Sequence, residues 1–146
     1  MNKCLFYLLS FTWSLPMTIV GFLVALVLRI AGYKPKKYGY CYYFEVGNNW
    51  GGFSVGLVVV TDTTPSTHTK NHEHGHALQS CYWGAFMPFV ISIPSMIRYW
   101  YREYLVRVKK IPYSSLPVYD SAWFEGQATE WGDRFFEKLE DKNNTK

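Results

Sequence analysis

The chain has 146 residues, the length of a single domain. Hydrophobic residues make up 49% and charged residues only 18%, whereas ordinary soluble domains carry roughly 25% charged residues. The net charge of +4 is modest, and the sequence contains neither a nucleic-acid-binding motif nor a basic stripe interleaved with aromatic residues, which argues against nucleic acid as a partner. Its three cysteines are widely spaced and form no CxxC pair, so a disulfide framework is not expected.

The N-terminal segment is predicted to be a transmembrane anchor over residues 1–31. Residues 4–28 contain no charge, and a helix of about 25 residues spans about 37 Å, enough to cross a bilayer. Pro16 near its middle predicts a kink, which membrane helices tolerate. Only Lys3 precedes the segment, whereas four basic residues follow it closely, so the positive-inside rule places residues 32–146 in the cytoplasm.

Two strand-like runs follow the apolar segment. Residues 38–46 and 53–60 are rich in aromatic and β-branched residues, and residues 47–52 between them include turn-forming Gly and Asn. This pattern predicts a β-hairpin over residues 38–60. A polar loop leads from it to a helix predicted over residues 70–82.

The segment 83–110 is predicted to be a helix that is apolar first and basic afterwards. Residues 81–97 are uncharged over about 17 positions, near the lower limit for a membrane span, and five basic residues follow by residue 110. We expect this segment to dip into the membrane face or to pack on the anchor, with a full second span as the alternative.

The last predicted helix covers residues 120–140 and begins near Asp120 or Ser121, either of which is a suitable N-cap. Apolar residues recur in it at steps of three and four, which indicates one buried face. These residues are Phe124, Ala128, Trp131, Phe135 and Leu139. The predicted fold class is therefore α+β and mainly helical.

The strongest motif is His72-Glu73-His74-Gly75-His76, an HExxH sequence. On a helix His72 and His76 project from the same face one turn apart, so both imidazoles can bind one zinc ion. Glu73 then lies within reach of a water molecule on that ion and can take its proton. His68 and His72 have the same spacing and form a rival pair, and a surface helix this rich in histidine also binds metals adventitiously.

A catalytic zinc site needs a third protein ligand from another element. Glu125 is the preferred candidate, because a carboxylate between Trp123, Phe124 and Ala128 is costly to bury unless it is paired or binds a metal. The rival ligands are Glu130, Asp120 and His68. Tyr113 and Tyr119 are candidates for stabilising an oxyanion, although the chain has twelve tyrosines and most must be structural.

With these residues the chain resembles the gluzincin-type zinc metallopeptidases, which join HExxH to a glutamate on a second helix. Residues 125–128 resemble the ExxA form of that second motif. The chain is most similar to a group of small bacterial and phage membrane proteins with a WGG turn, an HExGHxxQS helix, a Pro-Ser stretch and a C-terminal ExxAxxxG. The matching segments are residues 50–52, 72–80, 93–95 and 125–132.

The resemblance implies a minimal zincin-like helical core in residues 32–146. It implies that His72, His76 and Glu125 bind Zn²⁺ and that Glu73 activates water to hydrolyse a peptide or amide bond. The expected partners are the lipid bilayer and a peptide or protein substrate. The alternative is a membrane protein without activity, in which a metal ion joins two helices for stability.

Overall fold

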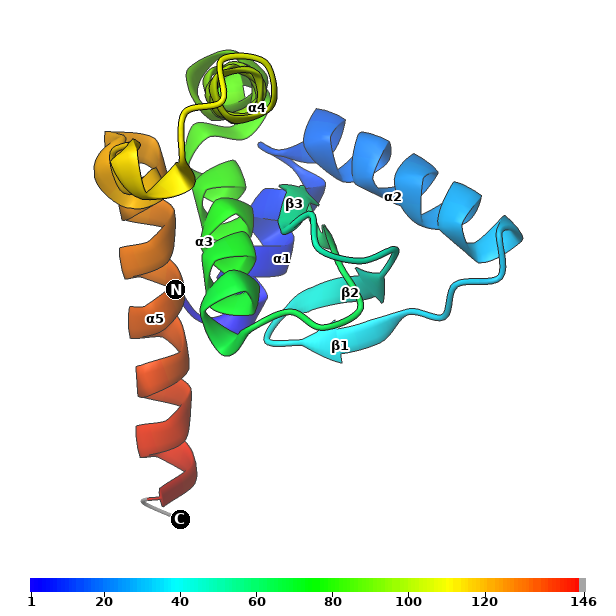
Figure 1. Cartoon of the computed structure of the whole chain (residues 1–146). Coiled ribbons are helices and arrows are strands. Elements are labelled where there is room, and N and C mark those ends of the chain that lie inside the picture. The colour runs from blue at the N-terminus through cyan, green and yellow to red at the C-terminus, as the bar shows by residue number, and fades with distance from the viewer. Residues whose placement is uncertain (145–146) are drawn as a thin grey trace.

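The computed structural model describes residues 1–144, with side chains up to residue 141. It confirms an α+β fold that is mainly helical, with helices around a four-stranded sheet (Figure 1). The α-helices of the described residues are α1 (Lys3–Phe11), α2 (Leu15–Ile30), α3 (Thr67–Trp83), α4 (Ile93–Arg107) and α5 (Trp123–Asn144). The strands are β1 (Lys36–Tyr38), β2 (Cys41–Glu45), β3 (Gly52–Val55) and β4 (Val58–Thr61).

The N-terminal segment is two helices, so the prediction of one continuous transmembrane helix over residues 1–31 is wrong. α1 and α2 meet at 90°. The break falls at residues 12–14, and Pro16 lies in the first turn of α2, where its missing amide hydrogen costs no helical bond. Among the described helices, none is long and apolar enough to cross a bilayer alone, while α1 with α2, and α3 with α4, pass the same criteria as bent pairs.

The β-hairpin predicted over residues 38–60 is also wrong, because each of its two runs lies in a hairpin of its own. β1 pairs with β2 and β3 with β4, both antiparallel, through two-residue turns that begin with Gly39 and Gly56. Both glycines have φ of +57°, a backbone conformation that such tight turns require. The two hairpins then join through parallel pairing of β2 with β4, giving the order β1-β2-β4-β3.

The sheet is covered on both faces. Tyr43 and Val59 belong to a cluster with Phe6 of α1, Ala77 of α3 and Phe135 of α5. Their sheet neighbours Phe44, Val58 and Val60 pack instead against Val24, Ala25 and Leu28 of α2. Because side chains alternate along a strand, burial on both faces explains why β4 is apolar at three successive positions. Residues 1–31 thus supply part of the core.

The predicted helix 83–110 is irregular in its first part. A 3₁₀ turn (Gly84–Phe86) and a π-helical turn (Pro88–Ser92) follow α3, and the chain bends by 117° before it continues as α4. Met87 and Ile91 in this bend are buried against Met17 of α2. Two further 3₁₀ turns, Tyr113–Ser115 and Tyr119–Ser121, lead to α5, so Asp120 precedes the helix it was predicted to begin.

Candidate metal centre

The HExxH motif lies on α3, as predicted. Ser66 caps this helix, its hydroxyl accepting a hydrogen bond from the Thr69 amide at 3.0 Å. The exposed first turns explain the polar sequence before the motif, and the helix is buried from His72 to Cys81. Because His72 and His76 are buried, they are not part of a histidine-rich surface that binds metals adventitiously.

α5 crosses α3 at two glycines, which lets their backbones approach closely. A Cβ atom on Gly132 would lie 1.9 Å from the carbonyl oxygen of Asn71, and Gly75 of the motif makes the second contact. A glycine inside a helix costs about 1 kcal/mol relative to alanine, so the close approach accounts for its presence. The crossing brings Glu125, in the first turn of α5, over the histidines of α3.

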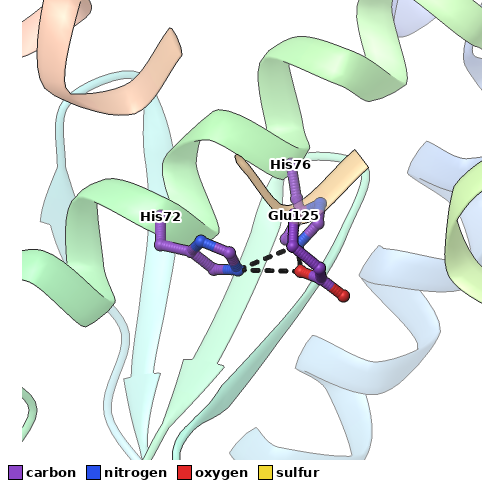
Figure 2. Close-up of side chains that lie close together, drawn as sticks. All are labelled: His72, His76 and Glu125. Carbon is purple, nitrogen blue, oxygen red and sulfur yellow. Dashed lines mark hydrogen bonds and ion pairs between the residues drawn. The ribbon is translucent and has the colours of Figure 1, made fainter. Parts of the chain in front are cut away.

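Three predicted ligands converge at this crossing (Figure 2). The Nε2 atoms of His72 and His76 each lie 3.2 Å from Oε2 of Glu125, and 3.1 Å from one another. All three residues are buried, and Glu125 is completely so. The triangle of ligand atoms therefore has three nearly equal edges inside the protein.

Hydrogen bonds at the far side of His76 determine which of its ring nitrogens carries the hydrogen. Gln79 donates from Nε2 to the carbonyl oxygen of Phe124 at 2.8 Å, and a carbonyl can only accept. The amide oxygen of Gln79 therefore faces Nδ1 of His76 at 2.7 Å and accepts its hydrogen. In the neutral imidazole Nε2 is then a bare acceptor that points to Glu125.

The same reasoning applies to His72 through a longer relay. The hydroxyl of Thr129 donates its single hydrogen to Oδ2 of Asp120 at 2.9 Å. Its oxygen, 2.8 Å from Nδ1 of His72, can then only accept, so the hydrogen of neutral His72 is on Nδ1. Nε2 of His72 is a second bare acceptor. Partners of this kind commonly orient metal-binding histidines.

Two imidazole nitrogens and a carboxylate oxygen this close together repel one another unless a proton or a metal cation lies between them. The triangle has edges of 3.1 and 3.2 Å. Ligands that bind tetrahedral zinc at about 2.0 Å lie about 3.3 Å apart, so the observed triangle matches one face of such a site. The donor set of two nitrogens and one oxygen also suits zinc. These residues therefore fit a metal ion.

Glu125 is held as an anion. Burial alone raises the pKa of its carboxyl. In the chain without a metal ion, however, a hydrogen on Nε2 of either histidine is donated to this carboxylate, and these hydrogen bonds oppose burial and bring the pKa well below its usual range. Ser95 in the first turn of α4 adds a hydrogen bond to the other carboxylate oxygen, Oε1, at 2.5 Å. Oε1 is thereby bound to Ser95, while Oε2 faces the two histidines.

Glu73, the predicted base, is buried next to the sheet. Its Oε2 atom has no hydrogen-bond partner among the described residues, which is unusual for a buried polar atom. Burial is the largest influence on the carboxyl and raises its pKa, while the nearby His76 and His72 lower it. A Cβ atom on Gly52 would lie 3.0 Å from Oε1 of Glu73, so the strand β3 passes directly beside the carboxylate.

Tyr119 is brought to the centre, whereas Tyr113 is not. The ring of Tyr119 lies 6.3 Å from that of His72, and its hydroxyl interacts with Ser95 and Glu125. Burial first, and then the charge of Glu125, raise the pKa of Tyr119 to about 12, so the hydroxyl keeps its hydrogen. Tyr113 instead donates a hydrogen bond to Glu103 and is exposed.

The rival ligands lie outside the triangle. His68 is exposed and lies 3.7 Å from Asp120. Glu130 is exposed and forms an ion pair with Arg134 on its own helix. Asp120 contributes through Thr129 rather than directly. His74 points away from the triangle, stacked on Phe135 with ring centroids 4.2 Å apart.

Several residues of the centre were missed by sequence reasoning. Gln79, Ser95 and Thr129 contact the ligands, yet serine, threonine and glutamine are common and their partners are far away in the sequence. The available signals were the longer HExGHxxQS pattern, in which the glutamine is Gln79, and the Pro-Ser stretch at residues 93–95, in which the serine is Ser95. No family model, curated protein or solved structure matches the chain, so the chemistry of the centre is inferred from its own geometry.

Proposed function

We propose that the chain is a zinc-dependent hydrolase of peptide or amide bonds. The observation that carries this proposal is the buried triangle of ligand atoms from His72, His76 and Glu125, with Oε2 of Glu73, which has no hydrogen-bond partner among the described residues, near it. A purely structural zinc site commonly has four protein ligands, whereas three ligands leave one position for water or substrate. Three described ligand atoms match the second kind of site.

His72, His76 and Glu125 would hold the ion. When bound, zinc supplies a Lewis acid that lowers the pKa of water to about 7 and polarises a carbonyl group. Glu73 accepts the proton of the attacking water at Oε2 and later gives it to the departing amine. Its raised pKa suits this exchange, since a general base works best when its pKa approaches the working pH.

The surroundings supply two further functions. β3 is an edge strand of the sheet and passes beside Glu73, so the part of its edge near Glu73 is positioned for pairing with an extended peptide substrate. The Tyr119 hydroxyl keeps its hydrogen, which it directs to Glu125, and once zinc binds that carboxylate the same donor is suited to a developing oxyanion. Both features favour a peptide or amide carbonyl as the reacting group.

The test compares three variants of the zinc-loaded protein on quenched fluorogenic peptides. We expect Glu73→Gln to keep its zinc and lose hydrolysis by at least 100-fold, in line with the contribution of general bases. His72→Ala should lose both zinc and activity. His68→Ala is the matched control, because this histidine is exposed and outside the triangle, and it should keep both. Undiminished hydrolysis by Glu73→Gln would overturn the proposal.

A second function is favoured by the position of the triangle between two helices. Glu125 and His76 are 49 positions apart, and a metal ion between them would join α5 to α3. If this joining were its only role, chelation would lower the melting temperature and no peptide in a broad library would be cleaved. The Glu73→Gln variant would then bind zinc like the unmodified chain, and neither protein would hydrolyse peptides. The two would differ only in their melting temperature.

A further inference from the structure

The first relevant surface is the outer face of α2. Its inner face packs on the sheet through Val24, Ala25 and Leu28. The opposite face is also apolar and is exposed, with Leu23 and Leu26 each 57% and Ile30 79% accessible. An ordinary surface helix presents polar residues to water, so a helix that is apolar on all sides needs an apolar partner.

α4 presents a second exposed apolar stripe. Its members recur at steps of three and four, which places them on one face of the helix. They are Ile93, Met96, Ile97, Trp100, Tyr101 and Tyr104. Arg98 and Arg102 lie on another face, where they donate hydrogen bonds to the carbonyl oxygens of residues 117–119. α4 is therefore fixed to the protein by its arginines while its apolar stripe is unpartnered.

The two surfaces meet at the start of both helices. Met17 of α2 is buried against Met87 and Ile91, which directly precede α4. The exposed rings of Trp13 and Phe86 lie 6.1 Å apart across the same junction. In Figure 1, α4 is seen end-on above α3 and α2 extends to the right, both away from the C-terminal part of α5. The exposed apolar area is thus shared by two helices that meet at this junction.

The dimensions favour a position within one leaflet of a bilayer. α2 has 16 residues and α4 has 15, so they measure about 24 Å and 22 Å, shorter than the roughly 30 Å hydrocarbon core. The bends of 90° and 117° turn the chain back instead of continuing it across. Amphipathic helices that lie in the interface bury their apolar face about 5–10 Å deep.

The charges at the ends of both helices indicate the kind of lipid. Arg29 lies in the last turn of α2 and Lys34 follows this helix, while Arg107 ends α4 and Lys109 and Lys110 follow it. Trp100, Tyr101 and Tyr104 lie between the aliphatic start of α4 and these cations, the order found where a helix passes from acyl chains to headgroups. Basic residues in this position attract anionic headgroups.

We infer that α2 and α4 together form a docking surface for one leaflet of an anionic lipid bilayer, without crossing it. The inference depends on exposed side chains and helix geometry and does not require the metal centre to be active. It replaces the single transmembrane anchor expected from the apolar N-terminus. It also places the start of α4, which carries Ser95, close to the lipid surface.

Flotation with vesicles tests the docking surface. Vesicles of phosphatidylcholine with about 30% phosphatidylserine should carry the purified full chain, and phosphatidylcholine alone should carry at least fivefold less. Ile97→Asp with Trp100→Asp should reduce flotation at least tenfold. Phe53→Asp is the matched control, since Phe53 is exposed on β3, and it should float like the unmodified chain. Equal flotation of the double variant and the control would overturn the inference.

Labelling of cysteines distinguishes docking from crossing. In a Cys4→Ser background, Asn2→Cys and Lys34→Cys flank α1 and α2. With the chain added to preformed vesicles, a membrane-impermeant maleimide should label both positions to the same extent. Labelling of only one position would show that α1 and α2 cross the bilayer.

A stable dimer that buries Trp100 and does not float would show instead that a second copy covers the surface. Either outcome rejects the inference.

Discussion

Gly75 on α3 lies directly against the backbone of Ala128 on α5, so that a Cβ atom at position 75 would be 1.8 Å from the Ala128 carbonyl oxygen. No side chain fits into this distance. The contact sets the separation of the two helices three residues after Glu125, and hence the position of that carboxylate over His72 and His76. A glycine in the middle of the HExxH motif thus allows α5 to come close enough for Glu125 to lie beside the two histidines.

Gly75→Ala should therefore separate α3 from α5. Overpacking of a close contact costs about 1–3 kcal/mol, and displacement of Glu125 should weaken zinc binding at least tenfold. Thermal unfolding and zinc titration measure both effects. Glu137→Ala, at an exposed position on α5, is the control and should change neither. A Gly75→Ala protein with unaltered melting temperature and affinity would contradict the assigned role of this contact.

Zinc should stabilise the folded chain through the three ligands. A ligand at 100 times its dissociation constant contributes about 2.7 kcal/mol, which corresponds to a melting temperature higher by on the order of 10 °C in a chain of this size. Differential scanning calorimetry with and without zinc measures the shift. His76→Ala and Glu125→Ala should show almost none of it, whereas His68→Ala should show all of it. An equal shift in all three variants would place the ion elsewhere.

The relay from Asp120 through Thr129 should tune zinc affinity. Thr129→Val removes the hydroxyl at nearly constant volume, so Nδ1 of His72 loses its acceptor. Loss of such an orienting partner typically weakens metal binding 10–100-fold. Competition with a fluorescent zinc chelator measures the constant. Thr129→Ser, which keeps the hydroxyl, should restore most of the affinity, and failure of serine to do so would indicate that the methyl group matters instead.

His74 should make the fold sensitive to acid. Burial lowers the pKa of its imidazole to about 3, against about 6.5 in an unfolded chain. The unfolded chain therefore binds a proton first as pH falls, so the stability that neutral His74 contributes is complete above pH 6.5 and declines from there toward pH 3. The decline approaches 1.4 kcal/mol per pH unit.

Urea unfolding of the metal-free chain at pH 7 and pH 5 measures this decline. His74→Phe, which keeps the ring stacked on Phe135, should reduce the difference between the two pH values. An unchanged difference in this variant would assign the acid sensitivity to other groups.

The sequence was sufficient to select the three side chains that converge, because the pattern that marks them as candidate ligands is local and rare. Two histidines one helical turn apart indicate a metal site, and so does a glutamate among aromatic residues. Both patterns can be recognised from neighbouring residues alone. The orienting partners could not be predicted, since Thr129 and Asp120 became partners of His72 only through the crossing of α5 over α3. No periodicity in the sequence encodes that crossing.

The errors have equally specific causes. The pairing of β2 with β4 is parallel and joins residues that are not neighbours in a hairpin, whereas sequence patterns reveal mainly the turn that comes next. Gly39 and Gly56 were the overlooked signals, since each begins a tight turn. The N-terminal break at residues 12–14 was obscured by uniform hydrophobicity, which does not distinguish one straight helix from two bent ones.

Because His76 and Glu125 are far apart in the sequence, a metal ion bound to both would influence which segment of the chain unfolds first. The two residues are 49 positions apart and the segment between them includes the whole of α4, so an ion held by both would act as a reversible cross-link around that segment. A cross-link restricts the unfolded chain more strongly the longer the loop that it closes. Removal of the ion would then loosen the segment that contains α4 and its exposed apolar side chains, and proteolytic cleavage after the arginines of α4 would increase as the metal content falls.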